Sequence, residues 1–298
     1  MKDDRRKFVV ASGIGMLGIL GATNAVSQSS YQAKKIRLGV TDLSFHRITG
    51  AVVAAVLERM GFDVQRSYAL HEQNFERLRN NDIDMIASAW LPYSHGVYKK
   101  RVEEVIATKE LGLHYEPYAM WGVPDYVPEA LVSSVPDLKK PEVTEKMNRV
   151  IQGIGPGAGI TRFSIKMMEQ YGLTNAGYEF RTGTEADCVR AFEDAVKEKK
   201  WVVVPLWWPQ FLHYRYKIRE LSDPKSLLGG VDRAVLLARE DRLRTLFNDS
   251  QIAKLNKIKL SNKTVSELDY LVVRDRVDLD LVARQWLDMN HDLTKDWV

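Results

Sequence analysis

Short apolar runs alternate along the chain with longer segments in which apolar residues recur at helical spacing. Residues 36–40 predict a strand, residues 48–60 predict a helix and residues 62–64 resume a strand. A helical stretch around 75–79 and an apolar strand at 85–90 follow. Strands that alternate with helices in this way favour a mostly parallel sheet covered by helices.

A second unit with the same alternation begins at residue 150. It is predicted to contain strands at 150–154, 178–180 and 201–206 and helices at 160–171 and 185–199. A Pro/Gly-rich turn at 223–230 then precedes another apolar strand at 234–238, and the remainder is amphipathic and predicted to be helical. The pattern therefore predicts an α/β fold with two similar lobes.

The N-terminal segment differs from the rest of the chain. Basic residues between positions 2 and 7 precede an uncharged run, 8–26, that glycines interrupt. This order is typical of a signal peptide, and small residues place the expected cleavage after Ala25. The pair Arg5-Arg6 resembles a twin-arginine export signal. We expect residues 1–25 to direct export to the periplasm, or to tether the protein to a membrane if they stay uncleaved.

Composition and residue spacing exclude several classes of function. The chain of 298 residues is 45% hydrophobic and 28% charged, which excludes a disordered or collagen-like protein. A net charge of +4 does not favour nucleic acid, and Cys188, the single cysteine, cannot form an internal disulfide. The six histidines show no pairing at metal-ligand spacing, and no serine lies in a nucleophile-elbow pattern. We therefore expect no catalytic residue, no metal and no cofactor.

Residues 153–159 form a glycine-rich loop between a predicted strand and a predicted helix, whose N-terminus offers free N–H donors. Three interpretations stay open on the residues alone. The loop is a turn that needs glycine conformations, or a dinucleotide site suggested by the spacing of Gly153, Gly155 and Ala158, or a site for a substrate carboxylate. Pro156 argues against the dinucleotide site.

Tryptophans stand at the ends of two predicted strands. Trp90 ends one strand, and Trp207 and Trp208 end another. Ligands bind outside the carboxyl ends of the strands in parallel α/β sheets, so these rings are expected to border a cleft. They either close the core of their lobe or hold a quaternary ammonium group, which is recognised by its charge and its methyl surface.

Four motifs in order resemble the glycine betaine and proline betaine substrate-binding proteins of ABC transporters. They are Ser88-Ala89-Trp90-Leu91-Pro92-x-x-His95, the loop from Gly153 to Ile160, Trp207-Trp208-Pro209-Gln210-Phe211 and the turn from Tyr216 to Lys225. The similarity covers nearly the whole chain after the signal segment. Gly155 departs from the family pattern, which has Asp there, and Gln210 and Phe211 replace His and Trp.

The resemblance implies a periplasmic-binding-protein fold of the type II kind, with a ligand cleft between two lobes. Lobe I is expected to comprise residues 36–118 plus 226–298, and lobe II residues 119–225. The implied function is that of an exported, non-catalytic and monomeric protein that delivers a small zwitterion to a membrane permease powered by an ATPase.

The resemblance also implies an aromatic cage and departs from it at one position. Trp90 and Trp207 would close on a trimethylammonium group, but Leu43 stands where the family places a third tryptophan, with Phe45 the nearest aromatic residue. A desolvated cation–π contact contributes up to about 2 kcal/mol, so the loss of one ring would weaken binding roughly tenfold.

The ligand's carboxylate is expected to meet the backbone N–H groups of Gly159 and Ile160, helped by His95. Choline, carnitine, proline and histidine stay open as other ligands. A different class of function is an exported nucleotide-dependent oxidoreductase that uses the 153–159 loop. A third is a binding protein that serves a chemosensory or regulatory receptor.

Overall fold

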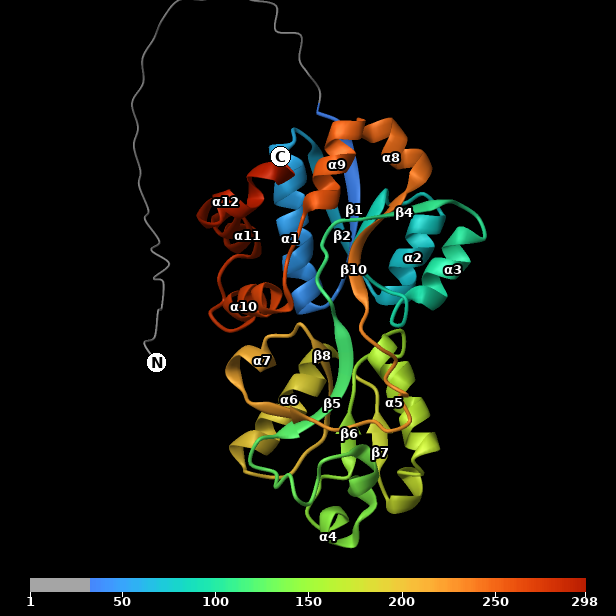
Figure 1. Ribbon diagram of the computed structural model, residues 1–298, viewed down its shortest axis with the longest axis vertical. Coiled ribbons are helices and arrows are strands. Elements are labelled where there is room, and N and C mark those ends of the chain that lie inside the picture. Colours follow the sequence, from blue (N-terminus) through green and yellow to red (C-terminus); the bar gives the residue numbers. More distant parts are fainter. Residues whose placement is uncertain (1–32) are drawn as a thin grey trace, which may run out of the picture. The chain divides into compact units, whose positions relative to one another are not determined.

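Strand β1 (Lys35–Thr41) and helix α1 (Ser44–Arg59) open the part of the chain that the structure, a computed structural model, describes, residues 33–298 (Figure 1). Leu43, in an extended conformation, precedes the first turn of α1. Of the 16 residues in α1, 12 are buried, because the helix packs on the sheet and also against α10 (Asn262–Val273) and α11 (Leu279–Met289). The expected signal segment lies outside the described residues.

The first lobe is built on a five-stranded sheet. Its strands are β1, β2 (Asp63–Ala69), β3 (Met85–Leu91), β4 (Thr108–Leu111) and β10 (Arg233–Arg239). Besides α1, α10 and α11, its helices are α2 (His71–Arg79), α3 (Gly96–Glu103), α8 (Glu240–Leu246), α9 (Asp249–Lys257) and α12 (His291–Thr294). None of the helices within residues 33–298 has the length and apolarity that a membrane crossing needs.

The second lobe contains two smaller sheets. One has the order β8 (Val204–Trp208), β5 (Tyr118–Pro124), β9 (Ile218–Glu220), and the other pairs β6 (Val150–Gln152) with β7 (Glu179–Arg181). Its helices are α4 (Pro141–Thr144), α5 (Gly159–Gln170), α6 (Glu185–Lys197) and α7 (Leu212–Arg215). Short 3₁₀ turns lie at Val135–Lys139, Thr174–Ala176 and, in the first lobe, Lys295–Trp297.

The α/β fold class is confirmed, whereas the expectation of mostly parallel sheets is only partly correct. In the order β2-β1-β3-β10-β4, β1 is parallel to β2 and β3, but β10 is antiparallel to both of its neighbours. Strands β8, β5 and β9 are also antiparallel. Strand β10 is antiparallel because the chain re-enters the first sheet from the second lobe. Arg233, the first residue of β10, therefore pairs with Leu91, the last residue of β3.

Most predicted elements lie within a few residues of observed ones. The predicted strand at 201–206 is displaced to β8, and the helix expected around 75–79 already begins at His71. Strand β5 has no counterpart among the predicted strands, because its pattern does not alternate and the strand is buried on both faces over Met120–Pro124. The predicted lobe boundaries at residues 118 and 225 stay a prediction.

Candidate functional site

Three aromatic rings meet where β3 and β8 end. The Phe45 ring centroid lies 5.1 Å from that of Trp90 and 5.6 Å from that of Trp207. All three side chains are buried, and they come from α1 and β3 of the first lobe and from β8 of the second. The fold therefore brings both predicted cage tryptophans into contact with one ring, that of Phe45.

Leu43 does not supply a ring and lies in the apolar core. It is 8% exposed, its backbone N–H donates to Thr41 O over 2.9 Å, and it forms the extended N-cap of α1. Phe45, two residues later, instead supplies the ring that contacts Trp90 and Trp207. Two further tryptophans of the second lobe have other partners: the Trp121 Nε1–H donates to Ser164 Oγ over 2.8 Å, and Trp208 stacks on His213.

The indole of Trp90 is fixed by a buried polar group. Its Nε1–H donates to Ser88 Oγ over 3.1 Å and to the Tyr115 hydroxyl over 3.2 Å. These two hydroxyl groups are also hydrogen-bonded to each other. Ser88 has a left-handed φ of 66°, where the partner strand β10 has an irregular register. Such a conformation costs on the order of 1–3 kcal/mol in a non-glycine residue and is often found at functional sites.

The segment after β3 holds His95 against Trp90. The Trp90 backbone N–H donates to His95 Nδ1 over 3.0 Å, and the two rings stack with centroids 6.3 Å apart. Asp232, directly before β10, accepts hydrogen bonds from the backbone N–H of Tyr93 at 2.6 Å and that of Ser94 at 3.1 Å. The segment is thus anchored at both ends by buried hydrogen bonds.

The glycine loop of the second lobe packs directly on this segment. A Cβ atom on Gly159 would lie 2.9 Å from Ser94 Cα, and one on Gly153 would lie 2.3 Å from Phe180 Cζ. None of the glycines within 153–159 has a positive φ, so close approach rather than turn conformation explains Gly153 and Gly159, whereas a Cβ on Gly155 would have no neighbour nearer than 4.0 Å. Arg162, in the first turn of α5, donates to Ser94 O and fastens the loop to the first lobe.

Gly159 and Ile160 begin helix α5, which has no side-chain cap. The first N–H groups of a helix have no partner within the helix, so they are available as hydrogen-bond donors. Ile160 itself is 6% exposed. The predicted carboxylate-binding residues thus lie at the same junction between the lobes as His95.

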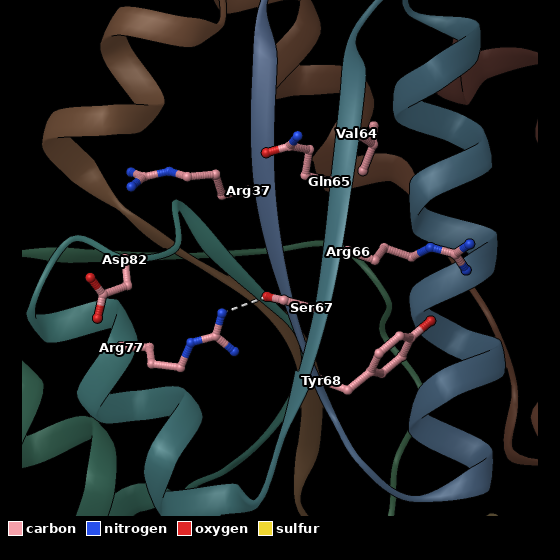
Figure 2. A pocket seen from close by; sticks show the side chains of 8 residues that line it. All are labelled: Arg37, Val64, Gln65, Arg66, Ser67, Tyr68, Arg77 and Asp82. Carbon is pink, nitrogen blue, oxygen red and sulfur yellow. Dashed lines mark hydrogen bonds between the residues drawn. The ribbon is translucent and has the colours of Figure 1, made fainter.

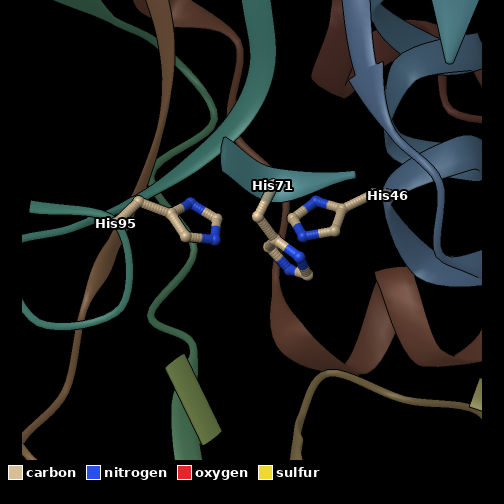
Figure 3. A group of neighbouring side chains, drawn as sticks. All are labelled: His46, His71 and His95. Carbon is tan, nitrogen blue, oxygen red and sulfur yellow. The ribbon is translucent and has the colours of Figure 1, made fainter. Parts of the chain in front are cut away.

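The structure also gathers three histidines that the sequence analysis left apart. His46, His71 and His95 are buried, and each offers a ring nitrogen that lies within 4.8 Å of those of the other two (Figure 3). Burial lowers the pKa of His71 to about 4 and holds the pKa values of His46 and His95 well below 6.5. All three rings are therefore uncharged at neutral pH. The sequence carries one signal for this grouping, which is that each histidine follows shortly after one of the first three strands.

A buried acidic pair was likewise missed by sequence reasoning. Ser44, the first residue of α1, donates to Glu185 of α6 through its backbone N–H and its hydroxyl group, both over 2.9 Å. Asp269 of α10 accepts the Phe211 N–H at 3.0 Å. Burial raises the pKa of both carboxyl groups, and the proximity of Glu185 raises that of Asp269 further. This pair joins elements of the two lobes.

A separate surface pocket of about 610 Å³ lies along the edge strand β2 (Figure 2). It is lined by Arg37, Val64, Gln65, Arg66, Ser67, Tyr68, Arg77 and Asp82. Figure 2 shows Arg77 bonded to Ser67 on one face of the strand, with Arg66 and Tyr68 on the other. The pocket wraps around the edge of the strand, and none of the predicted site residues lines it.

Comparison with known families gives a match over nearly the whole described chain. Residues 34–289 match the model of the substrate-binding domain of ABC-type glycine betaine transport systems. Among curated proteins, the glycine betaine/carnitine transport binding protein of Listeria monocytogenes is 27% identical over 161 residues, which cover 54% of this chain and 52% of that protein. The match thus spans about half the length of that relative.

Solved structures show the same fold. Lactococcal OpuAC, in its closed conformation with glycine betaine, superposes with a TM-score of 0.78 at 22% identity, covering 89% of this chain and 99% of that chain. ProX of Borrelia burgdorferi, a glycine betaine/L-proline-binding protein, gives 0.78 at 24% identity and covers 89% and 97%. These similarities establish the two-lobe fold of periplasmic binding proteins.

Proposed function

This chain belongs to the family of ABC-type glycine betaine substrate-binding domains, and we propose that it is the exported substrate-binding component of an ABC importer. In this function it binds a small quaternary ammonium zwitterion such as glycine betaine between its lobes and delivers it to a permease and its ATPase. The family consists of transport binding proteins rather than enzymes, so the exported oxidoreductase is not favoured.

The observation that carries this proposal is the convergence of Trp90 and Trp207 from opposite lobes. Both rings contact Phe45, so a cationic group that enters between the lobes meets aromatic faces from each of them. A desolvated cation–π contact contributes up to about 2 kcal/mol. Because Phe45 already contacts both tryptophans, binding of a trimethylammonium group requires its ring to move aside or to form one wall of the cage.

The carboxylate of the zwitterion would bind at the N-terminus of α5. Gly159 and Ile160 offer backbone N–H groups there, and α5 has no side-chain cap to compete with the ligand. The helix dipole favours an anion at this end. A ligand with a cation at one end and a carboxylate at the other would therefore join the two lobes and favour the closed arrangement.

Export and lobe organisation complete the proposal. We infer that residues 1–25 direct the protein to the periplasm and are removed, and that it acts there as a monomer. The chain would cross between lobes near 118–124 and near 223–230, which is supported by the membership of β4 and β10 in the first sheet and of β5 and β9 in the second. Mass spectrometry of the exported protein tests the cleavage site.

Calorimetric titration of the mature protein, stripped of ligand by unfolding and refolding, tests the function. Glycine betaine, choline, carnitine, proline and histidine are titrated separately. Saturable heat from glycine betaine supports the proposal, and a preference for choline would show that the carboxylate is not recognised. Heat from proline or histidine alone would retain the transport role and reject the cage, whereas no heat from any of the five would contradict the proposed function.

A further inference from the structure

Two carboxyl groups lie at one side of the junction between the lobes, where α1 and α10 of the first lobe meet α6 and the segment after β8 of the second (Figure 1). Ser44 of α1 donates to both carboxylate oxygens of Glu185. Asp269 of α10 accepts the Phe211 N–H at 3.0 Å. The acidic pair, Glu185 and Asp269, therefore holds the two lobes together from opposite sides of the junction.

The two carboxyl groups have different surroundings. Glu185 accepts a donor at each of its oxygens, and it lines a pocket of about 360 Å³ that leaves it partly exposed. Asp269 is fully buried, and no hydrogen bond within residues 33–298 reaches its Oδ1. A buried acceptor without a donor is costly, and more so when it is charged. The geometry therefore favours a negative charge on Glu185 and disfavours one on Asp269.

A proton on Oδ1 of Asp269 removes this cost. Burial and the neighbouring charge of Glu185 raise the pKa of Asp269 well above 3.8, and burial also raises the pKa of Glu185. Two carboxyl groups in one enclosed site do not both ionise readily, so one of them keeps its proton. The proton turns Oδ1 into a donor beside the oxygen atoms of Ser44 and Glu185.

The basic side chains around the acidic pair have carboxylate partners of their own. Arg47 of α1 favours the ionised form of Glu185, but it pairs with Asp42. Arg274 of α10 pairs with Glu193 of α6 and lies over the Phe211 ring. The other titratable side chains on α6 that lie next to Glu185 or line the same pocket are Asp187, Cys188, Arg190 and Asp194. Arg190 pairs with Asp187, and burial raises the pKa of the Cys188 thiol to about 12, so neither supplies a free charge.

Separation of the lobes would change the surroundings of both carboxyl groups. Glu185 would lose the donors of Ser44, and Asp269 would lose the nearby charge of Glu185 and gain contact with water. The pKa values would return toward 4.5 for Glu185 and 3.8 for Asp269, and both groups would be ionised at neutral pH. The closed arrangement thus holds one proton more than the open one.

We propose that closure of the lobes over the ligand takes up one proton, which the acidic pair holds at the junction. This inference rests on the proposed function, in which the ligand favours the closed arrangement, and it makes the junction a pH-sensitive latch. A state that binds more protons is favoured as pH falls, so ligand affinity decreases as pH rises, by up to about tenfold per pH unit.

A metal ion is a poorer occupant of this site than a proton. Ca²⁺ takes about six to eight oxygen ligands. The groups that face the acidic pair are instead hydrogen-bond donors, namely the N–H and O–H of Ser44 and the N–H of Phe211. Two carboxyl groups that already accept these donors do not complete a coordination shell.

Calorimetric titration in two buffers of different ionisation enthalpy counts the protons. Glycine betaine, which has no group that titrates near neutral pH, is titrated into the mature protein at pH 7.5 in phosphate and in Tris. Exposed imidazole groups are mostly uncharged at this pH. We expect an uptake of up to about one proton per ligand bound and an affinity that falls as pH rises. Binding without proton uptake would overturn the proposal.

Variants locate the proton. Asp269→Asn keeps an acceptor for the Phe211 N–H but cannot take up a proton, so the uptake should vanish and the affinity should no longer depend on pH. Asp275→Asn, the same substitution at an exposed position, is the matched control and should keep the uptake of the unmodified protein. Equal uptake in all three proteins would contradict the proposal. If Asp269→Asn does not fold, Glu185→Gln replaces it and should lower the uptake, because it removes the charge beside Asp269.

Small-angle X-ray scattering separates failure of the latch from failure of the proposed function. Without ligand, acidification from pH 8 to pH 6 should reduce the radius of gyration of the unmodified protein and of Asp275→Asn, but not that of Asp269→Asn. If the unmodified protein binds no quaternary ammonium ligand, the proposed function fails, and this compaction still supports the latch. In that case an unchanged radius would overturn the latch as well.

Discussion

Glu185 of the second lobe accepts two hydrogen bonds from Ser44 of the first, one from the backbone N–H and one from the hydroxyl group, both over 2.9 Å. The carboxylate thereby caps the N-terminus of α1 with a group from α6, which begins at the capping box formed by Thr184 and Asp187. The contact between the lobes and the start of the central helix of the first lobe are thus coupled through the side chain of Glu185.

Replacement of Ser44 by alanine tests this contact. Ser44→Ala removes the hydroxyl donor and leaves the partly buried carboxyl group of Glu185 with one hydrogen bond fewer. The free energy of unfolding is expected to fall by about 0.5–1.5 kcal/mol, the net contribution of one hydrogen bond. Urea denaturation measures the change. Ser250→Ala, at an exposed position of α9, is the control and should change stability by less than about 0.5 kcal/mol.

The buried acidic pair makes stability depend on pH in a defined direction. Because the pKa of Asp269 is raised in the native state, its contribution to stability is complete below the unfolded value of 3.8 and is lost as pH rises through the native value. Asp269→Asn keeps an acceptor for the Phe211 N–H but removes a buried charge. We expect the variant to gain stability relative to the unmodified protein as pH rises, measured by denaturation across a pH series. A constant difference would contradict this.

His71 gives a pH dependence of the opposite sign. Its pKa is about 4 in the native state against 6.5 in the unfolded chain, so the unfolded state binds more protons between these values. Stability is complete above pH 6.5 and falls toward pH 4 by about 1.4 kcal/mol per pH unit for this group. His71→Phe should flatten the slope in this window. An unchanged slope would show that His71 is not buried in the uncharged form.

The glycine loop offers a matched pair of substitutions. Gly159→Ala places a methyl group 2.9 Å from Ser94 Cα, whereas the nearest atom to a Cβ on Gly155 is 4.0 Å away. Gly159→Ala is therefore expected to hold the loop away from the first lobe and to reduce ligand affinity by about tenfold or more. Gly155→Ala should leave affinity unchanged. Calorimetric titration measures the ligand affinity of both variants. An equal loss of affinity in the two would show that close approach to the first lobe is not the reason for a glycine at position 159.

The two cage tryptophans should differ in what they contribute. Trp207→Ala and Trp90→Ala each remove a ring and are expected to weaken binding of glycine betaine by roughly tenfold or more. Trp90→Ala should also destabilise the fold further, because its Nε1–H bonds to Ser88 and Tyr115, whereas Trp207 Nε1 has no partner within residues 33–298. Trp286→Ala, on α11, is the control for binding. Unchanged affinity in both cage variants would reject the cage.

Local pattern determined much of what could be expected from the sequence by itself. Strand and helix periods are properties of neighbouring residues, so the α/β alternation, the placement of Trp90 and Trp207 at strand ends, and the glycine loop before α5 were predictable. The four motifs added the family and the order of the site along the chain. The family resemblance also placed Leu43 where a third ring is expected.

Only the tertiary structure decided which distant residues meet. The meeting of His46, His71 and His95 depends on the strand order β2-β1-β3. The acidic pair joins residues 84 positions apart in the chain, Glu185 and Asp269. The antiparallel entry of β10 depends on where the chain returns from the second lobe. Contacts of this kind arise from sheet topology and lobe closure, which no local period encodes, and burial then sets the charge state of the groups that they enclose.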